Sequence, residues 1–222
     1  MKSLSKSLTL LAASAFISIN AFASTLNYNI SGDNSIEAYL STDGTTFGSA
    51  FASSNTWWNT ESGNTTVQNG QDYFLLIKVV DDNAEERDPQ AFAGDFALTG
   101  NHQFSNGTQS LFTNLTDWGV NNTGFGDPYH NPYSLGSNGE VGLVPWSTYK
   151  FSVSGTYTME NIDSSAHWIW NTERSDQGYN SDNTAYFMTR ITSVPDGGST
   201  LAFLALSISG LSFLGRRYRK TK

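Results

Sequence analysis

The stretch Asp72–Asp81, with the sequence DYFLLIKVVD, contains the longest apolar run in the middle of the chain. A short, continuous apolar run between polar residues is typical of a central strand that is buried on both faces. Shorter segments around it alternate apolar and polar residues, and clusters of Asn, Gly, Ser and Asp separate them. These further strands are predicted at residues 26–30, 36–40, 94–98, 149–153, 156–159, 167–170 and 185–191.

No segment between Ser24 and Ser193 has the i, i+3, i+4, i+7 apolar repeat of an amphipathic helix. Eight or so short strands with long polar loops therefore predict an all-β domain, a β-sandwich of the jelly-roll type. The length of 222 residues fits one such domain with a short segment at each end. The chain has no cysteine, which excludes disulfides, thiolate metal sites and a cysteine nucleophile.

Charge is distributed unevenly along the sequence. Between Ser24 and Ser193 there are 19 acidic and 5 basic residues, a formal charge of −14, whereas five basic residues follow Gly215. Proteins that bind nucleic acid need basic patches to displace counterions from phosphates. The acidic domain therefore excludes nucleic acid as a partner.

Residues 1–23 have the three parts of a secretory signal. Lys2 and Lys6 form a positive region, Leu8–Ile19 is apolar, and Ala21-Phe22-Ala23 is a cleavage site of the A-x-A type. We expect the export machinery to remove this segment, so that the mature protein starts at Ser24. The alternative is that these residues form an amphipathic first helix of the domain.

The C-terminal segment 194–222 also has three parts. A turn-forming stretch comes first, followed by an uncharged run of 19 residues, Gly197–Gly215, and then a basic cluster with Arg216 and Arg217. As a helix, the uncharged run would be about 28 Å long, enough for one hydrocarbon core. The basic end would stay cytoplasmic, with the acidic domain outside. The turn-forming stretch consists of Val194, Pro195, Asp196, Gly197 and Gly198.

This tail resembles the C-terminal sorting signals of the PEP-CTERM class, in its VPDSG-CTERM variety. The resemblance implies that an exosortase recognises the Val-Pro-Asp motif after export and cuts near it. The protein would then be in the inner membrane transiently and afterwards at the cell surface or outside the cell. The alternative is a permanent type I membrane anchor.

The domain from Leu26 to Trp170 resembles galactose-binding-like sandwich modules. The likeness rests on a Gly-Asp-Asn turn within residues 30–40, on the paired tryptophans at 57–58, on Gly70-Gln71-Asp72 and on the AHWIW strand at 166–170. It implies a jelly-roll sandwich, and such modules often hold a structural calcium ion in a loop. One fold hosts many functions, so the likeness supports the fold more than the activity.

Carbohydrate binding is the leading functional hypothesis. Aromatic faces stack on the C–H surfaces of sugars, and nearby carboxylate and amide groups take the hydroxyls. Trp168 and Trp170 lie two apart, so they share one strand face and are predicted to belong to the core. The alternative is that all six tryptophans of the chain pack inside. The candidate ligand-binding residues are Trp57, Trp58, Trp118, Asp117, Asn121 and Trp146.

Calcium is the candidate cofactor. Residues 81–88 hold five carboxylates directly after the long strand, and Ca²⁺ prefers six to eight hard oxygen ligands. The spacing is not that of an EF-hand, and a solvated acidic loop is the alternative. Asp33, Asp95 and Asp127 could complete the site only if the fold brings them near. The candidate ligands in the loop are Asp81, Asp82, Glu85, Glu86 and Asp88.

The sequence predicts no catalytic site. The three histidines lack the spacing of zinc hydrolases, and no G-x-S-x-G motif is present. Three hypotheses follow for the exported protein, in order of preference. The first is a non-catalytic module that binds extracellular polysaccharide, the second is a structural surface or matrix protein without a specific ligand, and the third is a glycan-acting enzyme with a pair of carboxylates.

Overall fold

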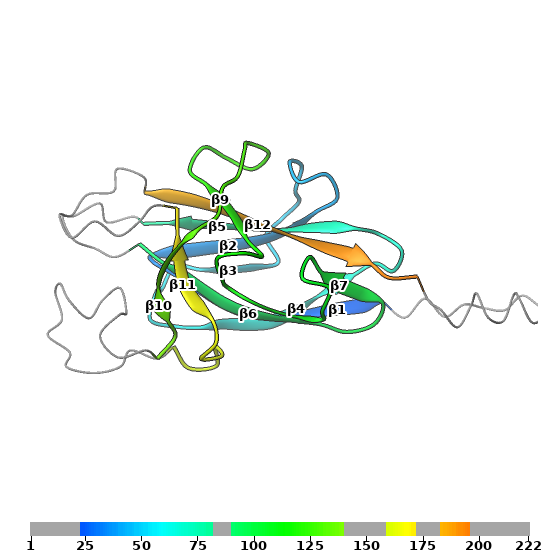
Figure 1. The fold of residues 1–222 in the computed structure, drawn as a ribbon, viewed down its shortest axis with the longest axis horizontal. Coiled ribbons are helices and arrows are strands. Elements are labelled where there is room, and N and C mark those ends of the chain that lie inside the picture. The colour runs from blue at the N-terminus through cyan, green and yellow to red at the C-terminus, as the bar shows by residue number, and fades with distance from the viewer. Residues whose placement is uncertain (1–22, 82–89, 140–158, 172–182, 196–222) are drawn as a thin grey trace, which may run out of the picture.

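The protein is a two-layered β-sandwich in the computed structural model (Figure 1). The structure describes residues 23–81, 90–139, 159–171 and 183–195. All strand pairs are antiparallel. The described residues form the strands β1 (Ser24–Gly32), β2 (Ser35–Ser41), β3 (Ala52–Ser54), β4 (Glu61–Val67), β5 (Tyr73–Val80), β6 (Phe92–Leu98), β7 (His102–Phe104), β8 (Ser110–Phe112), β9 (Gly119–Asn121), β10 (Tyr133–Ser137), β11 (His167–Trp170) and β12 (Thr184–Ser193).

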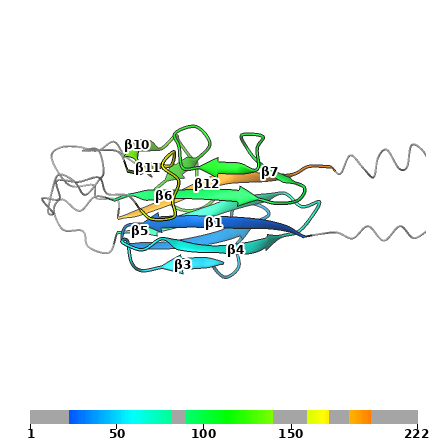
Figure 2. The same ribbon diagram turned by 90° about the horizontal axis from the view of Figure 1, so that it is seen from below.

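Each layer is a six-stranded sheet. Sheet A has the order β10-β11-β6-β1-β4, with β8 also paired to β6, and it faces the viewer in Figure 2. Sheet B has the order β3-β2-β5-β12-β7, with β9 also paired to β12. The coarse prediction of an all-β sandwich is therefore confirmed.

Strand β5 occupies the centre of sheet B, as its apolar sequence predicts. It pairs with β2 along one edge and with β12 along the other. Leu75, Ile77 and Val79 point into the sandwich and are fully buried. On the other face Leu76 is also buried, whereas Lys78 is only partly covered, so the strand is less enclosed on its outer face than on its inner one.

The core lies between the two sheets and contains several large aromatic rings. Phe92 of sheet A contacts Phe187 of sheet B with ring centroids 4.9 Å apart, and it contacts Trp118 at 5.5 Å. Trp170 reaches the same Phe187 at 6.0 Å. Trp168 and Trp170 are both buried, so the prediction that these two tryptophans belong to the core is confirmed.

The two ends of the described domain lie together. The backbone N–H of Asn101 donates to Ser24 Oγ at the start of β1, and the carbonyl of Asn101 accepts from the N–H of Val194 just after β12. Figure 1 shows the start of β1 and the end of β12 at the same end of the sandwich. The segments that precede and follow the domain therefore start from neighbouring points.

Strand β4 was not predicted from the sequence, because Gly63 and Asn64 are typical of a loop. Gly63 lies opposite Tyr28 of β1, and a Cβ atom at position 63 would meet the Tyr28 hydroxyl. The glycine thus makes room for an inward-facing ring at the edge of sheet A. The short strands β3, β7, β8, β9 and β10 were also missed, and the predicted strands at 149–153 and 156–159 lie outside the described residues, except for Met159, which is not in a strand.

The predicted signal and the predicted membrane helix cannot be compared with the structure. Residues 1–22 and 196–222 lie outside the described part of the chain. Within the four described ranges, no helix is long and apolar enough to cross a membrane.

We expect Phe187→Ala to lower the free energy of unfolding by roughly 3–5 kcal/mol, because it removes a buried ring from between the sheets and leaves a cavity. Phe47→Ala removes the same atoms from a side chain that is 42% exposed, and it serves as the matched control. Urea unfolding followed by tryptophan fluorescence measures both variants. Equal losses would contradict the assignment of Phe187 to the core.

Candidate functional site

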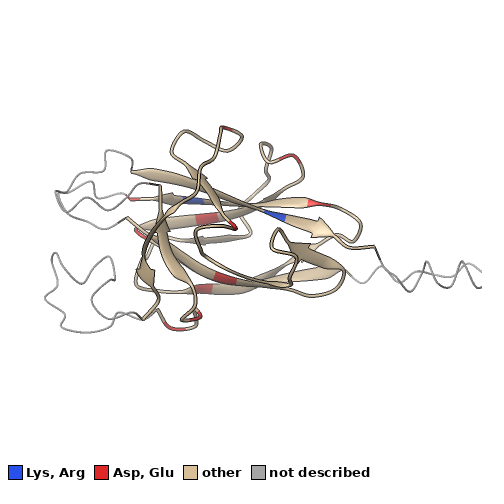
Figure 3. Cartoon of the chain, viewed as in Figure 1, with Lys and Arg blue, Asp and Glu red and all other residues tan. Residues whose placement is uncertain are grey.

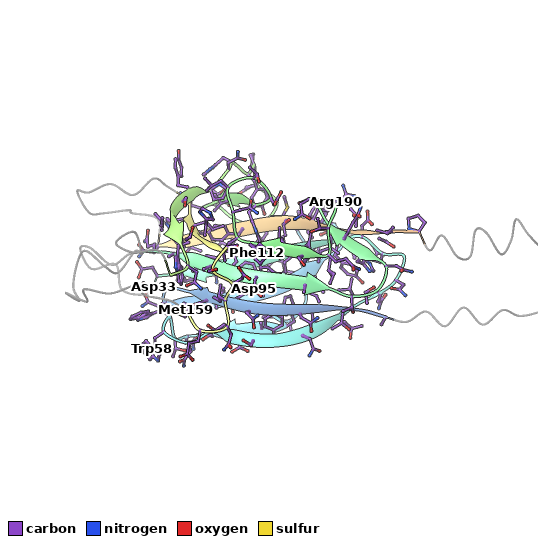
Figure 4. All side chains as sticks on the ribbon, turned by 60° about the horizontal axis from the view of Figure 1, so that its bottom comes forward. Asp33, Trp58, Asp95, Phe112, Met159 and Arg190 are labelled. Atoms are coloured by element: carbon purple, nitrogen blue, oxygen red, sulfur yellow. The ribbon has the colours of Figure 1, made fainter. Side chains whose placement is uncertain are left out.

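A groove crosses the outer face of sheet A. Its volume is about 380 Å³, and strands β6 and β8 form its floor while the segment 159–166 forms one wall. Figure 4 views the molecule from this side, with Asp95 and Phe112 labelled. The lining residues are Asp95, Phe96, Ala97, Ser110, Phe112, Asn161, Ile162 and Asp163.

The floor of the groove follows from the alternation of side chains along two paired strands. Asp95 lies opposite Phe112, and Ala97 lies opposite Ser110. Phe96 and Leu111 point to the other face and are buried in the core. Neighbouring residues of a strand face opposite sides of a sheet. Because Phe96 and Leu111 face the core, the residues next to them in each strand face outward.

The wall is held in place by a buried amide. Asn138 is 2% exposed, and its Nδ2 donates to the carbonyls of Met159 and Ile162 at 3.2 and 2.8 Å. Its Oδ1 accepts from the N–H of Met159 at 2.9 Å. Between these anchors Asn161 adopts a left-handed conformation with φ of 68°, which asparagine tolerates better than most residues. The Asn138 side chain thus forms hydrogen bonds with the loop backbone of the kind that a neighbouring strand would form.

Asp95 joins this wall to the floor. Its Oδ2 accepts from the N–H of Asp163 at 2.8 Å, and its Oδ1 accepts from Nδ2 of Asn29 at 2.8 Å. Both oxygens of Asp95 are therefore used by the protein, and the carboxylate positions the loop against the sheet. Among the described residues, the side chains of Ser110 and Asn161 make no hydrogen bond of their own, so both can serve a ligand.

Uncharged polar groups continue from the groove across sheet A. Asn29 of β1 lies between Asp95 and Ser62 of β4, and Asn27 lies between Ala97 and Asn64. Ser62, Asn27 and Asn64 are exposed. Amide and hydroxyl groups both donate and accept hydrogen bonds, which suits a ligand rich in hydroxyls.

The paired tryptophans lie in a turn before β4 and not in a strand. Trp58 is 57% exposed, while Trp57 is partly buried against the core and meets the Trp58 ring edge-on at 5.6 Å. The same turn is tied to the groove wall, because Oγ1 of Thr60 donates to the carbonyl of Glu160. Of the predicted tryptophans that the structure describes, Trp58 is thus the most exposed.

Trp118 is a correction to the sequence-based prediction. It is 2% exposed, contacts Phe92 and Phe96, and donates from Nε1 to the carbonyl of Phe112 at 3.1 Å. A ring enclosed on all sides has no face for a sugar. Instead it packs in the core and holds β8 through its indole N–H.

The two polar candidates near Trp118 build loops. Asp117 accepts from Nδ2 of Asn114 at 2.8 Å. Asn121 is 4% exposed, and its Oδ1 accepts from the N–H groups of Thr123 and Gly124. Neither side chain lines the groove. Trp146 lies outside the described residues.

Most of the predicted calcium ligands lie outside the residues that the structure describes. Asp82, Glu85, Glu86 and Asp88 belong to residues 82–89, which the structure leaves undescribed, whereas Asp81 and Asp33 are both 3% exposed at one end of the sandwich. The N–H of Asn34, next to Asp33, donates to the carbonyl of Val80, next to Asp81.

Two other acidic residues do not join this end of the sandwich. Asp95 lies in the groove, and Asp127 belongs to the loop that Asn121 supports. Within the described ranges, no three His, Asp or Glu side chains form a metal-ligating group. Calcium at residues 81–88 stays a prediction.

The sorting motif is described only at its start. Val194 is 37% exposed and follows β12 directly, with Pro195 after it. Asp196, Gly197, Gly198, Arg216 and Arg217 lie outside the described residues. The sorting hypothesis is therefore carried by the sequence.

A second group of aromatic residues covers the outer face of sheet B. Tyr39 contacts Phe47 with ring centroids 4.6 Å apart, and Phe125 reaches Phe47 and Tyr186 at 5.2 and 5.0 Å. Burial, reinforced by the Glu37 carboxylate, raises the pKa of Tyr39 to about 12. These rings pack edge-on or tilted against one another, although Phe47 stays 42% exposed, which indicates a packed cluster and not a flat platform.

Comparisons of the chain with protein-family models, curated proteins and solved structures gave no match. The sequence did not predict the main residues of the groove, which are Phe112, Asn161 and Asp163. Alternation in 94–98 could have placed Asp95 on an outer face, but no local signal marks Phe112 or the loop 159–166.

We expect Asn138→Ala to lower the free energy of unfolding by roughly 2–4 kcal/mol, because three hydrogen bonds are lost and buried backbone groups are left unsatisfied. Asn27→Ala, at an exposed position with one long hydrogen bond of 3.4 Å, is the control and should change little. Thermal unfolding measures both. A minor effect of Asn138→Ala would mean that the wall does not depend on this amide.

Proposed function

We propose that this protein binds polysaccharide outside the cell without catalysis, and that the groove on sheet A is its binding site. The observation that carries the proposal is the pairing of Phe112 with Asp95 across β8 and β6, next to the free side chains of Ser110 and Asn161. An aromatic ring beside polar groups is the combination that a sugar needs, since its C–H face stacks on the ring and its hydroxyls form hydrogen bonds.

Trp58 is proposed as a second aromatic contact. Its exposed ring belongs to the turn that Thr60 ties to Glu160, directly before the groove residue Asn161. A polymer can use contacts at both places, whereas a monosaccharide would fill only the groove. The shallow, open form of the site on a sheet face is consistent with a polymeric ligand.

A binding role is preferred over catalysis because of how the carboxylates are used. Both oxygens of Asp95 accept hydrogen bonds from the protein, and Asp163 Oδ1 accepts from the N–H of Ser165 at 2.7 Å. Each oxygen of Asp95 is therefore already tied to the protein, so the carboxylate supports the loop instead of standing free as a nucleophile or a proton donor does.

Export and processing are the second part of the proposal. The signal at residues 1–23 and the tail at residues 194–222 support export followed by cleavage by an exosortase-type enzyme. The described strands begin at Ser24 and end at Ser193, so cleavage at both predicted places would leave every described strand whole. We also infer that the sandwich is a jelly roll of the galactose-binding-like kind, a fold that suits a binding module.

We expect Phe112→Ala to weaken polysaccharide binding about tenfold, which corresponds to roughly 1.4 kcal/mol of ring–sugar contact. Affinity electrophoresis against a panel of soluble polysaccharides measures the change. Phe112→Leu keeps apolar bulk over the core but lacks the aromatic face, so it should also bind weakly while it stays folded.

Phe47→Ala is the matched control for this experiment, because it removes the same ring from the loop between β2 and β3 of sheet B. Trp58→Ala should weaken retention with little change in melting temperature, because the ring is exposed. Unchanged binding by Phe112→Leu would contradict the groove as the site. Failure of the unmodified protein to bind any polysaccharide would favour a structural surface or matrix protein.

Processing predicts a defined mass for the protein from its native culture. We expect an extracellular species that begins at Ser24 and ends between Pro195 and Gly198, because the signal and the tail are then both removed. Intact mass spectrometry of the membrane and extracellular fractions measures this. A membrane species that retains the tail to Lys222 would instead indicate a permanent anchor.

A further inference from the structure

The charged side chains around the groove all have the same sign. Asp95 and Asp163 line it, and Glu160 immediately precedes the lining residue Asn161. The described part of sheet A and of its loops contains no lysine or arginine. A ligand in the groove therefore meets negative charge without a compensating cation from these residues.

The two basic residues of the described ranges belong to sheet B, as Figure 3 shows. Lys78 of β5 pairs with Glu37, with 3.4 Å between Nζ and Oε2. Arg190 of β12 pairs with Asp72, with 3.0 Å between Nη2 and Oδ2. Both cations are engaged on the other layer, so neither can neutralise an anion bound to sheet A.

None of the internal segments outside the described residues has a net positive charge, since residues 82–89, 140–158 and 172–182 carry formal charges of −3, 0 and −2. Residues 140–158 contain one acidic and one basic residue, Glu140 and Lys150, and so add no formal net charge. Two like charges at contact distance in water repel by an energy that corresponds to about a fivefold loss of affinity. The repulsion weakens as salt screens it.

The hydrogen-bonding groups of the groove also favour an uncharged ligand over an anionic one. A carboxylate only accepts hydrogen bonds, and each of its two oxygens has a second lone pair. Asp95 and Asp163 can therefore accept from sugar hydroxyls beyond the bonds that they already make. A uronate or sulfate group has no proton to donate at neutral pH, so it finds no partner at these two positions.

On the basis of the proposed glycan-binding function, we infer that the groove selects uncharged polysaccharides and rejects acidic ones. The determinants are the carboxylates of Asp95 and Asp163 and the absence of a described cation on sheet A. The ligand class is an uncharged, hydroxyl-rich polysaccharide, and polyuronates and sulfated glycans are excluded.

The test uses pairs of polymers that share a backbone and differ in charge. We choose hydroxyethylcellulose with carboxymethylcellulose, mannan with polymannuronate, and dextran with dextran sulfate. Affinity electrophoresis in 10 mM salt gives the ratio of the affinities within each pair. We expect the protein to bind at least one neutral polymer and to bind its acidic partner at least about fivefold more weakly, with a smaller ratio in 0.5 M salt.

Ser110→Lys places a cation in the groove without removing a side-chain hydrogen bond among the described residues. This variant should bring the ratio of the neutral to the acidic affinity towards one, because it strengthens binding of the acidic polymer. Ala97→Lys, at an exposed position in the same groove, should change the ratio in the same direction. It keeps the test informative if Ser110→Lys does not fold. Ser53→Lys makes the same change in total charge on the exposed surface of β3 in sheet B and should leave the ratio unchanged.

Equal or tighter binding of the acidic polymer by the unmodified protein would overturn the inference and leave glycan binding intact. An equal effect of Ser53→Lys and Ser110→Lys would also overturn it, because the selection would then arise from the charge of the whole protein. If neither member of any pair binds, the proposed function is wrong and the inference is wrong with it.

Discussion

The pairing of β6 with β1 on one edge and with β8 on the other is the constraint on which both the core and the groove depend. One register places Phe96 and Leu111 between the sheets and, by alternation, Asp95 and Phe112 on the outside. A slip of one residue would exchange the two faces and place Asp95 in the core. Burial of the inner side chains thus keeps the outer side chains in place.

The groove also requires a wall, and the wall depends on buried hydrogen bonds instead of apolar packing alone. Asn138 holds the backbone at Met159 and Ile162, while Asp95 holds Asp163 from the side of the sheet. The bonds of Asn138 are buried and have few alternative partners, so they favour one position of the loop, and the exposed bond from Asp163 to Asp95 adds to this. The groove is therefore formed by contacts within the protein itself.

The two layers of the sandwich differ in how they meet solvent. Sheet B carries a cluster of aromatic rings on its outer face and both described cations in ion pairs, whereas sheet A presents amides, hydroxyls and carboxylates around the partly covered ring of Phe112. This asymmetry distinguishes the faces of two sheets that are similar in size. This asymmetry is the reason for proposing sheet A, and not sheet B, as the face that contacts a hydroxyl-rich ligand.

Features that repeat over a few residues could be predicted from the sequence alone. The apolar run at residues 73–80 became the central strand β5, and the two-residue spacing of Trp168 and Trp170 placed both rings inside, because side-chain direction in a strand follows a local period of two. The tertiary structure decided which distant strands are neighbours. It brought Phe112 beside Asp95, laid residues 159–166 over both, and enclosed Trp118 although polar residues surround it in the sequence. These contacts depend on strand register and on long-range burial, and neither leaves a pattern within a short stretch of sequence.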